Sequence, residues 1–152
     1  ACAMYPGDEA FFKSVKAEAT EQVQRISLHP CLALWCGNNE NSEAWHNWGW
    51  TNDMTKEDSA RIWNDYQKLF QRLLPEIVAE NAPGIAYHKS SPTYGRGDAR
   101  SYHSGDGHYW GVWHDAEDFS KYEEKRSRFM SEFGFQSWPN YRTVSYFAGS
   151  ET

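Results

Sequence analysis

Residues 31–41 read CLALWCGNNEN, an apolar run that changes abruptly into glycine, asparagine and glutamate. The apolar half predicts a buried strand, and His29-Pro30 directly before it ends any preceding helix. Gly37, two asparagines and the acid Glu40 then follow at the carboxyl end of this strand. Such a glutamate is either a solvated turn residue or a group positioned for chemistry.

Helical and strand-like segments alternate along the rest of the chain. Residues 8–26 and 56–74 carry apolar side chains at spacings of three and four, which predicts two amphipathic helices, and Pro75 should break or kink the second. Further strands are predicted at residues 83–92, 108–113 and 128–137, and further helices at 118–125 and 139–148. This alternation is typical of a parallel α/β sheet, in which functional groups gather at the carboxyl ends of the strands.

The composition limits the classes of partner. The 152 residues are enough for one domain or part of one, and 15 basic against 21 acidic residues give a net charge of −6. Without a basic run we expect no nucleic-acid partner, and without a long apolar stretch no membrane span. Cys2, Cys31 and Cys36 are an odd, sparse set, which favours reduced buried thiols over a disulfide framework. The composition leaves the cellular compartment undetermined.

Aromatic residues are the unusual feature, at 16% of the chain with 8 tryptophans. Many of these tryptophans lie near predicted turns rather than within regular apolar periodicity. Flat rings at turns can stack on the C–H faces of sugars, but they can also fill the space between structural layers. Composition supports both interpretations equally.

Glu40 and Glu132 each follow a strand-like apolar run. Parallel strands bring such residues to the same edge of a sheet even when they are far apart in sequence. Two carboxyl groups about 5–5.5 Å apart are what a retaining glycosidase needs, one as acid/base and one as nucleophile. A single glutamate in a loop is more often solvated or ion-paired, so the pair rather than either residue suggests catalysis.

Four segments carry a resemblance to a known family. HPCLALWCGNNENSEAWHNWGW (29–50) and SRFMSEFGFQSWP (127–139) resemble two signature segments of the β-mannosidases of glycoside hydrolase family 2, and GDGHYWGVW (105–113) and ACAMYP (1–6) resemble others. The resemblance implies a partial (β/α)8 TIM barrel, roughly its strands three to seven. Residues 1–152 would then be a single, incomplete segment of the catalytic barrel domain of a larger multidomain enzyme.

The resemblance also implies roles for individual residues. Glu40 matches the general acid/base, Glu132 the catalytic nucleophile, and Asn39 the residue that holds the 2-hydroxyl of the reacting sugar. Trp48 matches an aromatic wall of the sugar pocket.

Three more positions are implied to bind substrate. Tyr94 stands where the family more often has Trp, a departure that puts its stacking role in doubt, and His108 and Trp110 are expected near the nucleophile. In contrast, Asp98 and Asp106 lie in glycine-rich loops and are interpreted as turn residues, with Asp106 also a candidate to support a substrate-contacting side chain.

The implied activity is that of a retaining exo-β-mannosidase, which releases terminal β-D-mannose from the non-reducing ends of oligosaccharides. No organic cofactor is expected, and no metal, because the histidines lack a recurring ligand spacing. Two alternatives stay open: a β-glucosidase or β-galactosidase of the same family, and a non-catalytic carbohydrate-binding or structural fragment. A barrel that lacks strands leaves open sheet edges, through which the chain could self-associate.

Overall fold

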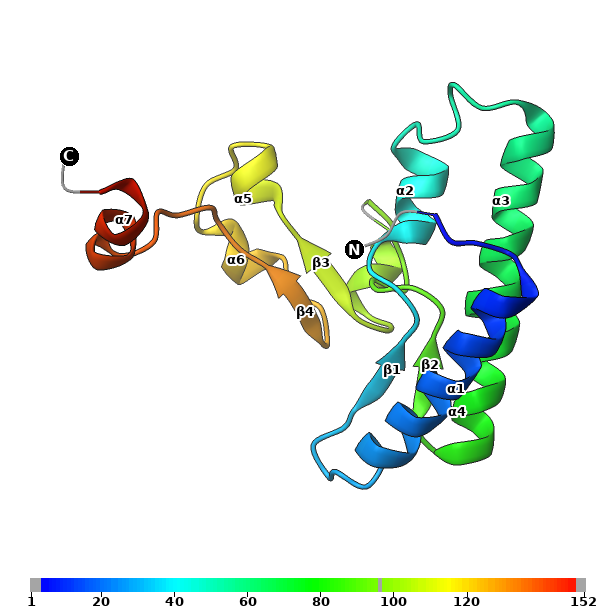
Figure 1. Ribbon diagram of the computed structural model, residues 1–152. Coiled ribbons are helices and arrows are strands. Elements are labelled where there is room, and N and C mark those ends of the chain that lie inside the picture. Colours follow the sequence, from blue (N-terminus) through cyan, green and yellow to red (C-terminus); the bar gives the residue numbers. More distant parts are fainter. Residues whose placement is uncertain (1–3, 96, 150–152) are drawn as a thin grey trace.

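The computed structural model describes residues 4–95 and 97–149 as a mixed α/β arrangement with short parallel strands (Figure 1). The elements in chain order are α1 (Glu9–Ile26), β1 (Leu34–Cys36), α2 (Asn41–Asn47), α3 (Lys56–Lys68), the π-helical η1 (Leu69–Leu73), α4 (Leu74–Asn81), β2 (Ala86–His88), the 3-10 helix η2 (Ala99–Tyr102), β3 (Gly107–Tyr109), α5 (Gly111–His114), α6 (Lys121–Glu124), β4 (Met130–Phe133) and α7 (Tyr141–Ala148). Within these described ranges no helix is both long and apolar enough to cross a membrane.

The strands form two parallel pairs, β1 with β2 and β3 with β4. Trp35 lies opposite Tyr87 in the first pair, and His108 lies opposite Glu132 in the second. A further parallel bridge joins Asn39 to the residue Ser91, beyond the ends of β1 and β2. The predicted parallel pairing is therefore confirmed locally, although the described strands form two two-stranded sheets.

The apolar core lies between the helices and the β1–β2 pair. Val23 of α1 and Ile77 and Val78 of α4 are buried together, and Trp35 and Tyr87 pack against them from the strands. Burial of each such aliphatic side chain contributes about 1.5–3 kcal/mol. The amphipathic faces predicted from the sequence therefore anchor the helical layer that supports β1 and β2 (Figure 1).

Side-chain caps start the long helices where the sequence indicated. Asp8 accepts a hydrogen bond from the Phe11 amide at the start of α1, and Thr55 accepts one from the Asp58 amide at the start of α3. The expected disruption at Pro75 takes the form of a change in hydrogen-bond register. Leu74 N–H bonds to the Leu69 carbonyl in the π-helical η1, and the chain continues as a helix into α4.

Two other expectations are wrong. The run 108–113 is not one strand, because β3 ends at Tyr109 and α5 begins at Gly111, with Trp110 as its N-cap. Cys31 and Cys36 are free thiols as expected, but both are exposed rather than buried, because β1 begins only at Leu34 and alternates its faces. Cys2 lies outside the described residues.

A close approach at Gly37 holds the end of β1 against the segment after β2. A Cβ atom at this position would meet the Tyr87 hydroxyl and would lie 2.7 Å from the Lys89 carbonyl oxygen. Only glycine fits such a contact. The loop that begins here leads directly to Glu40.

Candidate active site

The backbone presents Glu40 from a position between β1 and α2. Its N–H donates to the Ser91 carbonyl at 2.7 Å, and Ser91 N–H donates to the Asn38 carbonyl at 2.8 Å. Glu40 is the N-cap of α2 with φ 56° and ψ 6°, a left-handed conformation that is uncommon outside glycine, and its side chain makes no capping bond. Such a conformation costs on the order of 1–3 kcal/mol and is found most often at functional sites.

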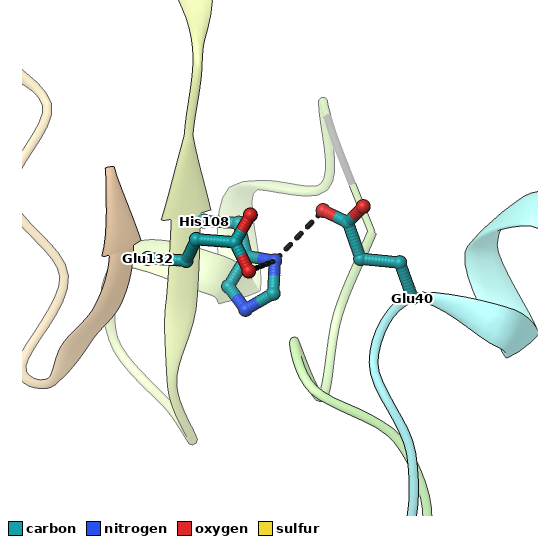
Figure 2. Close-up of side chains that lie close together, drawn as sticks. All are labelled: Glu40, His108 and Glu132. Carbon is teal, nitrogen blue, oxygen red and sulfur yellow. Dashed lines mark hydrogen bonds and ion pairs between the residues drawn. The ribbon is translucent and has the colours of Figure 1, made fainter. Parts of the chain in front are cut away.

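His108 lies between the two glutamates predicted to be catalytic, as Figure 2 shows. Its Nδ1 atom is hydrogen-bonded to Glu40 Oε1 at 2.7 Å and lies 3.6 Å from Glu132 Oε2. The three groups offer donor atoms that all lie within 4.8 Å of one another. The His108 side chain is only 5% exposed, whereas the Glu40 and Glu132 side chains are 20% and 34% exposed and remain accessible to a ligand.

The β3–β4 pair sets the position of Glu132. Glu132 lies beside His108 in the parallel register, and its Oε1 atom accepts a hydrogen bond from Trp110 Nε1 at 2.9 Å. This hydrogen bond fixes the orientation of the Glu132 carboxyl group. The two residues predicted near the nucleophile, His108 and Trp110, therefore both contact or approach Glu132.

The glutamates face a cavity of about 930 Å³, which is large enough for a sugar residue. Of the seven residues predicted for the site, six line this cavity: Glu40, Trp48, Tyr94, His108, Trp110 and Glu132. Asn39 is not among its lining residues. Its side chain is exposed, and its backbone forms the bridge to Ser91.

The aromatic residues at the cavity differ in how firmly they are held. Trp48 follows α2, is 51% exposed and meets Trp50 edge to face. The Arg100 guanidinium lies 4.3 Å from the centre of the Tyr94 ring and pairs with Asp98 at 2.6 Å. The interpretation of Asp98 as a turn residue is confirmed, since its carboxylate accepts from the Arg100 amide at the start of η2.

Asp106 is buried behind His108 and accepts hydrogen bonds from three residues, while a role in supporting a substrate-contacting side chain stays a prediction. Its Oδ2 atom accepts hydrogen bonds from the Ser91 hydroxyl and from the Ser131 hydroxyl, the latter at 2.7 Å, and its Oδ1 atom accepts from the Thr93 amide at 3.0 Å. The Ser91 hydroxyl is in turn 2.9 Å from His108 Nε2. Sequence reasoning missed Ser91, because the pair Ser-Ser before Pro92 carries only a turn signal.

The hydrogen bonds to Asp106 outweigh its burial. Burial alone would raise the pKa of Asp106, but the Ser91 and Ser131 hydroxyls and backbone N–H groups hold that pKa below its usual range. Because the folded state lowers this pKa, the ionised carboxylate contributes stability above about pH 4, its unfolded value, and loses this contribution as pH falls through the lower folded value.

The lowered pKa of Asp106 predicts how the stability of a variant depends on pH. Asp106→Asn should lower the free energy of unfolding by about 1–3 kcal/mol near neutral pH, since a charged acceptor of several hydrogen bonds is lost. The deficit relative to wild type should be constant from neutral pH to about pH 5 and should narrow below about pH 4. Thermal unfolding of the two proteins across this range measures the difference. A deficit that grew toward low pH would contradict the assignment.

The cluster of Glu40, His108 and Glu132 is also the one in the described part of the chain whose donor atoms are close enough to share a cation. We do not assign these residues as metal ligands. The 2.7 Å hydrogen bond between His108 and Glu40 and the Trp110 bond to Glu132 account for their arrangement. The expectation of a metal-free site stays a prediction.

The chain is similar to known proteins over almost all of its length, although no family model matches it. It is 33% identical to beta-mannosidase B of Aspergillus fumigatus over 99% of the chain, and 34% identical to beta-mannosidase of Rattus norvegicus over 95% of the chain. It spans 18% and 17% of the lengths of these two relatives.

A solved structure shows the same relationship. The crystal structure of beta-D-mannosidase from Dictyoglomus thermophilum superposes with a TM-score of 0.70 at 36% sequence identity, covering 95% of this chain and 17% of that protein. At this identity the likeness extends beyond the fold to common ancestry. The chain is therefore homologous, over nearly its whole length, to a segment of the beta-mannosidases.

Proposed function

We propose that the chain forms the catalytic centre of a retaining exo-β-mannosidase, which hydrolyses terminal non-reducing β-D-mannose residues by double displacement. The observation that carries the proposal is the approach of Glu40 and Glu132, whose facing atoms lie within 4.8 Å across a cavity. Retaining glycosidases hold their two carboxyl groups at about 5–5.5 Å, whereas inverting enzymes hold them roughly 6.5–9.5 Å apart. The homology supports mannose as the sugar.

In the first step Glu132 is the nucleophile. Its ionised carboxylate, which accepts from Trp110 Nε1, attacks the anomeric carbon and forms a glycosyl ester. Glu40 gives its proton to the departing glycosidic oxygen, so the aglycone leaves as an alcohol.

In the second step Glu40 is the base. It takes a proton from water, and the water oxygen attacks the anomeric carbon and releases the Glu132 carboxylate. The products are mannose and the alcohol, and both glutamates return to their starting states. Two inversions at the same carbon retain its configuration.

The remaining site residues are proposed to bind the sugar. Trp48 and Tyr94 line the cavity with rings that can stack on its C–H faces. Asn39 is proposed to hold the 2-hydroxyl, which is axial in mannose and so contributes to specificity. Asn39 is exposed and directly precedes Glu40 in the sequence.

We further propose that residues 1–152 are one segment of a catalytic (β/α)8 barrel, roughly its strands three to seven. The parallel pairs β1–β2 and β3–β4 support this, because each has the strand direction of a barrel. Large apolar side chains toward the end of the described chain, such as Trp138 and Tyr146, are 87% and 91% exposed. Further parts of the parent enzyme would cover them, and without those parts the chain would self-associate.

A panel of aryl β-glycosides tests the proposal. The intact protein that carries this chain should hydrolyse the β-mannoside with a kcat/KM at least about 100-fold above that for the β-glucoside or β-galactoside, since the axial 2-hydroxyl distinguishes them in the transition state. Release of the aryl alcohol is followed by absorbance. Preference for another sugar would keep the mechanism and overturn the substrate. Failure to cleave any of the three would favour the alternative of a non-catalytic carbohydrate-binding or structural fragment.

A further inference from the structure

The geometry behind Glu40 forms a continuous chain of hydrogen bonds. It runs from buried Asp106 Oδ2 to the Ser91 hydroxyl, from Ser91 to His108 Nε2 at 2.9 Å, and from His108 Nδ1 to Glu40 Oε1 at 2.7 Å. We propose that Asp106 and Ser91 are positioning residues that keep a proton on His108 Nε2. A second proton is then shared in the hydrogen bond between His108 Nδ1 and Glu40. The meaning of this for catalysis rests on the proposed function.

The direction of each bond follows from what its groups can donate. Both oxygens of Asp106 receive donors, the Thr93 amide on Oδ1 and two serine hydroxyls on Oδ2, so Asp106 acts as an acceptor-only carboxylate. The single hydroxyl proton of Ser91 is directed to Asp106. The Ser91 oxygen can therefore only accept from His108, which requires a proton on His108 Nε2.

With Nε2 protonated, one proton decides the state of the contact between His108 Nδ1 and Glu40. Either Glu40 carries it and donates to a neutral imidazole, or the imidazole carries it and donates to a carboxylate. Loss of this proton would leave a lone pair on Nδ1 facing the carboxylate of Glu40. The alternative tautomer would leave a lone pair on Nε2 facing the Ser91 oxygen. Both deprotonated arrangements are unfavourable, so the chain of hydrogen bonds holds a proton between His108 Nδ1 and Glu40, where a general acid needs it.

Five other titratable groups lie in or beside this chain of hydrogen bonds. They are Glu132 of β4, 3.6 Å from Nδ1; Asp106, 3.9 Å from Nε2; Cys36 of β1, next to Ser91; His88 of β2, which bonds to Thr93 at 2.6 Å; and Glu43 of α2, which lines the same cavity. Three of these five groups, Glu132, Asp106 and Glu43, are carboxyl groups.

Three variants of the intact protein separate this role from simple packing. Ser91→Ala removes the acceptor of the Nε2 proton. Asp106→Asn reverses the chain, because the Thr93 amide keeps an oxygen at Oδ1 and so places the new NH₂ group toward Ser91, whose hydroxyl can then donate to Nε2. Ser131→Ala is the matched control, since it removes another hydrogen bond to Asp106 without touching Ser91 or His108.

Two readouts apply to each variant. Exchange of the imidazole C2 proton of His108, followed by mass spectrometry across pH, reports its titration whether or not the protein is active. The pH profile of kcat/KM for an aryl β-mannoside reports the acid in catalysis. Both the exchange midpoint and the alkaline limb should move to lower pH by about 1–2 units in Ser91→Ala and Asp106→Asn, the size of one charge-assisted hydrogen bond. Ser131→Ala should move neither.

Each outcome decides a different claim. An unmoved exchange midpoint in Ser91→Ala, or an equal movement in Ser131→Ala, would overturn the positioning role, and Ser91→Ala suffices if Asp106→Asn fails to fold. If the protein cleaves no glycoside but shows the expected exchange shift, the positioning role of Asp106 and Ser91 stands and the proposed function is wrong. If the protein hydrolyses the β-mannoside but neither readout shifts in the variants, the proposed function stands and the positioning role is wrong.

Discussion

Glu132→Gln should lower kcat/KM for an aryl β-mannoside by about 10⁴-fold or more, the scale of removing a catalytic nucleophile. The amide cannot form the glycosyl ester, yet it has nearly the same shape and still lines the cavity. Binding of mannose, followed by calorimetry, should therefore persist within a few-fold. The intact protein is again the sample, with hydrolysis followed by release of the aryl alcohol.

Two further measurements make this result specific to Glu132. Glu123→Gln, the same change at an exposed acid on α6, should keep wild-type kcat/KM. A 2-deoxy-2-fluoro-β-mannosyl fluoride should add one sugar mass to the peptide that contains Glu132, because the electronegative fluorine slows hydrolysis of the ester. Label found on another peptide would place the nucleophile elsewhere, and an active Glu132→Gln protein would remove it from the mechanism.

Glu40→Ala should show an effect that depends on the leaving group. Loss of a general acid costs about 10²–10⁴-fold, and this should appear in full for a 4-methylphenyl β-mannoside, whose leaving oxygen needs a proton. A 2,4-dinitrophenyl β-mannoside leaves without protonation, so its first step should be nearly unaffected. The second step should then be slow, because no base activates water, and a burst of dinitrophenol should precede a low steady rate.

Azide supplies the control for this variant. It needs no base to attack the glycosyl ester, so it should raise the steady rate of Glu40→Ala and give a β-mannosyl azide with retained configuration. The wild-type enzyme should not respond in this way. Equal losses for both leaving groups, with no effect of azide, would mean that Glu40 positions the substrate and is not the acid/base.

Much of the local structure could be predicted because its causes are local. The spacing of apolar residues in 8–26 and the cap at Asp8 specify α1, and Thr55 does the same for α3. The apolar run before Glu40 predicts a strand from Cys31, whereas β1 begins at Leu34, since an apolar run does not show where pairing with β2 begins. The split of 108–113 at Trp110 leaves no periodic signal in the sequence.

The candidate site also has features that the sequence predicts and features that only the tertiary structure sets. The sequence by itself determined that Glu40 and Glu132 each belong to a short strand or its carboxyl end, and its motifs marked six of the residues that line the cavity. It carried no sign that His108 also bonds to Glu40, that Glu40 is left-handed, or that Ser91 links His108 to Asp106. The two contacts of His108 are hydrogen bonds between groups 17 and 68 positions apart, and they exist only after parallel pairing has set the register of the strands. Periodicity and capping act within a few residues, whereas the geometry of a catalytic site is fixed by contacts between segments that only folding brings together.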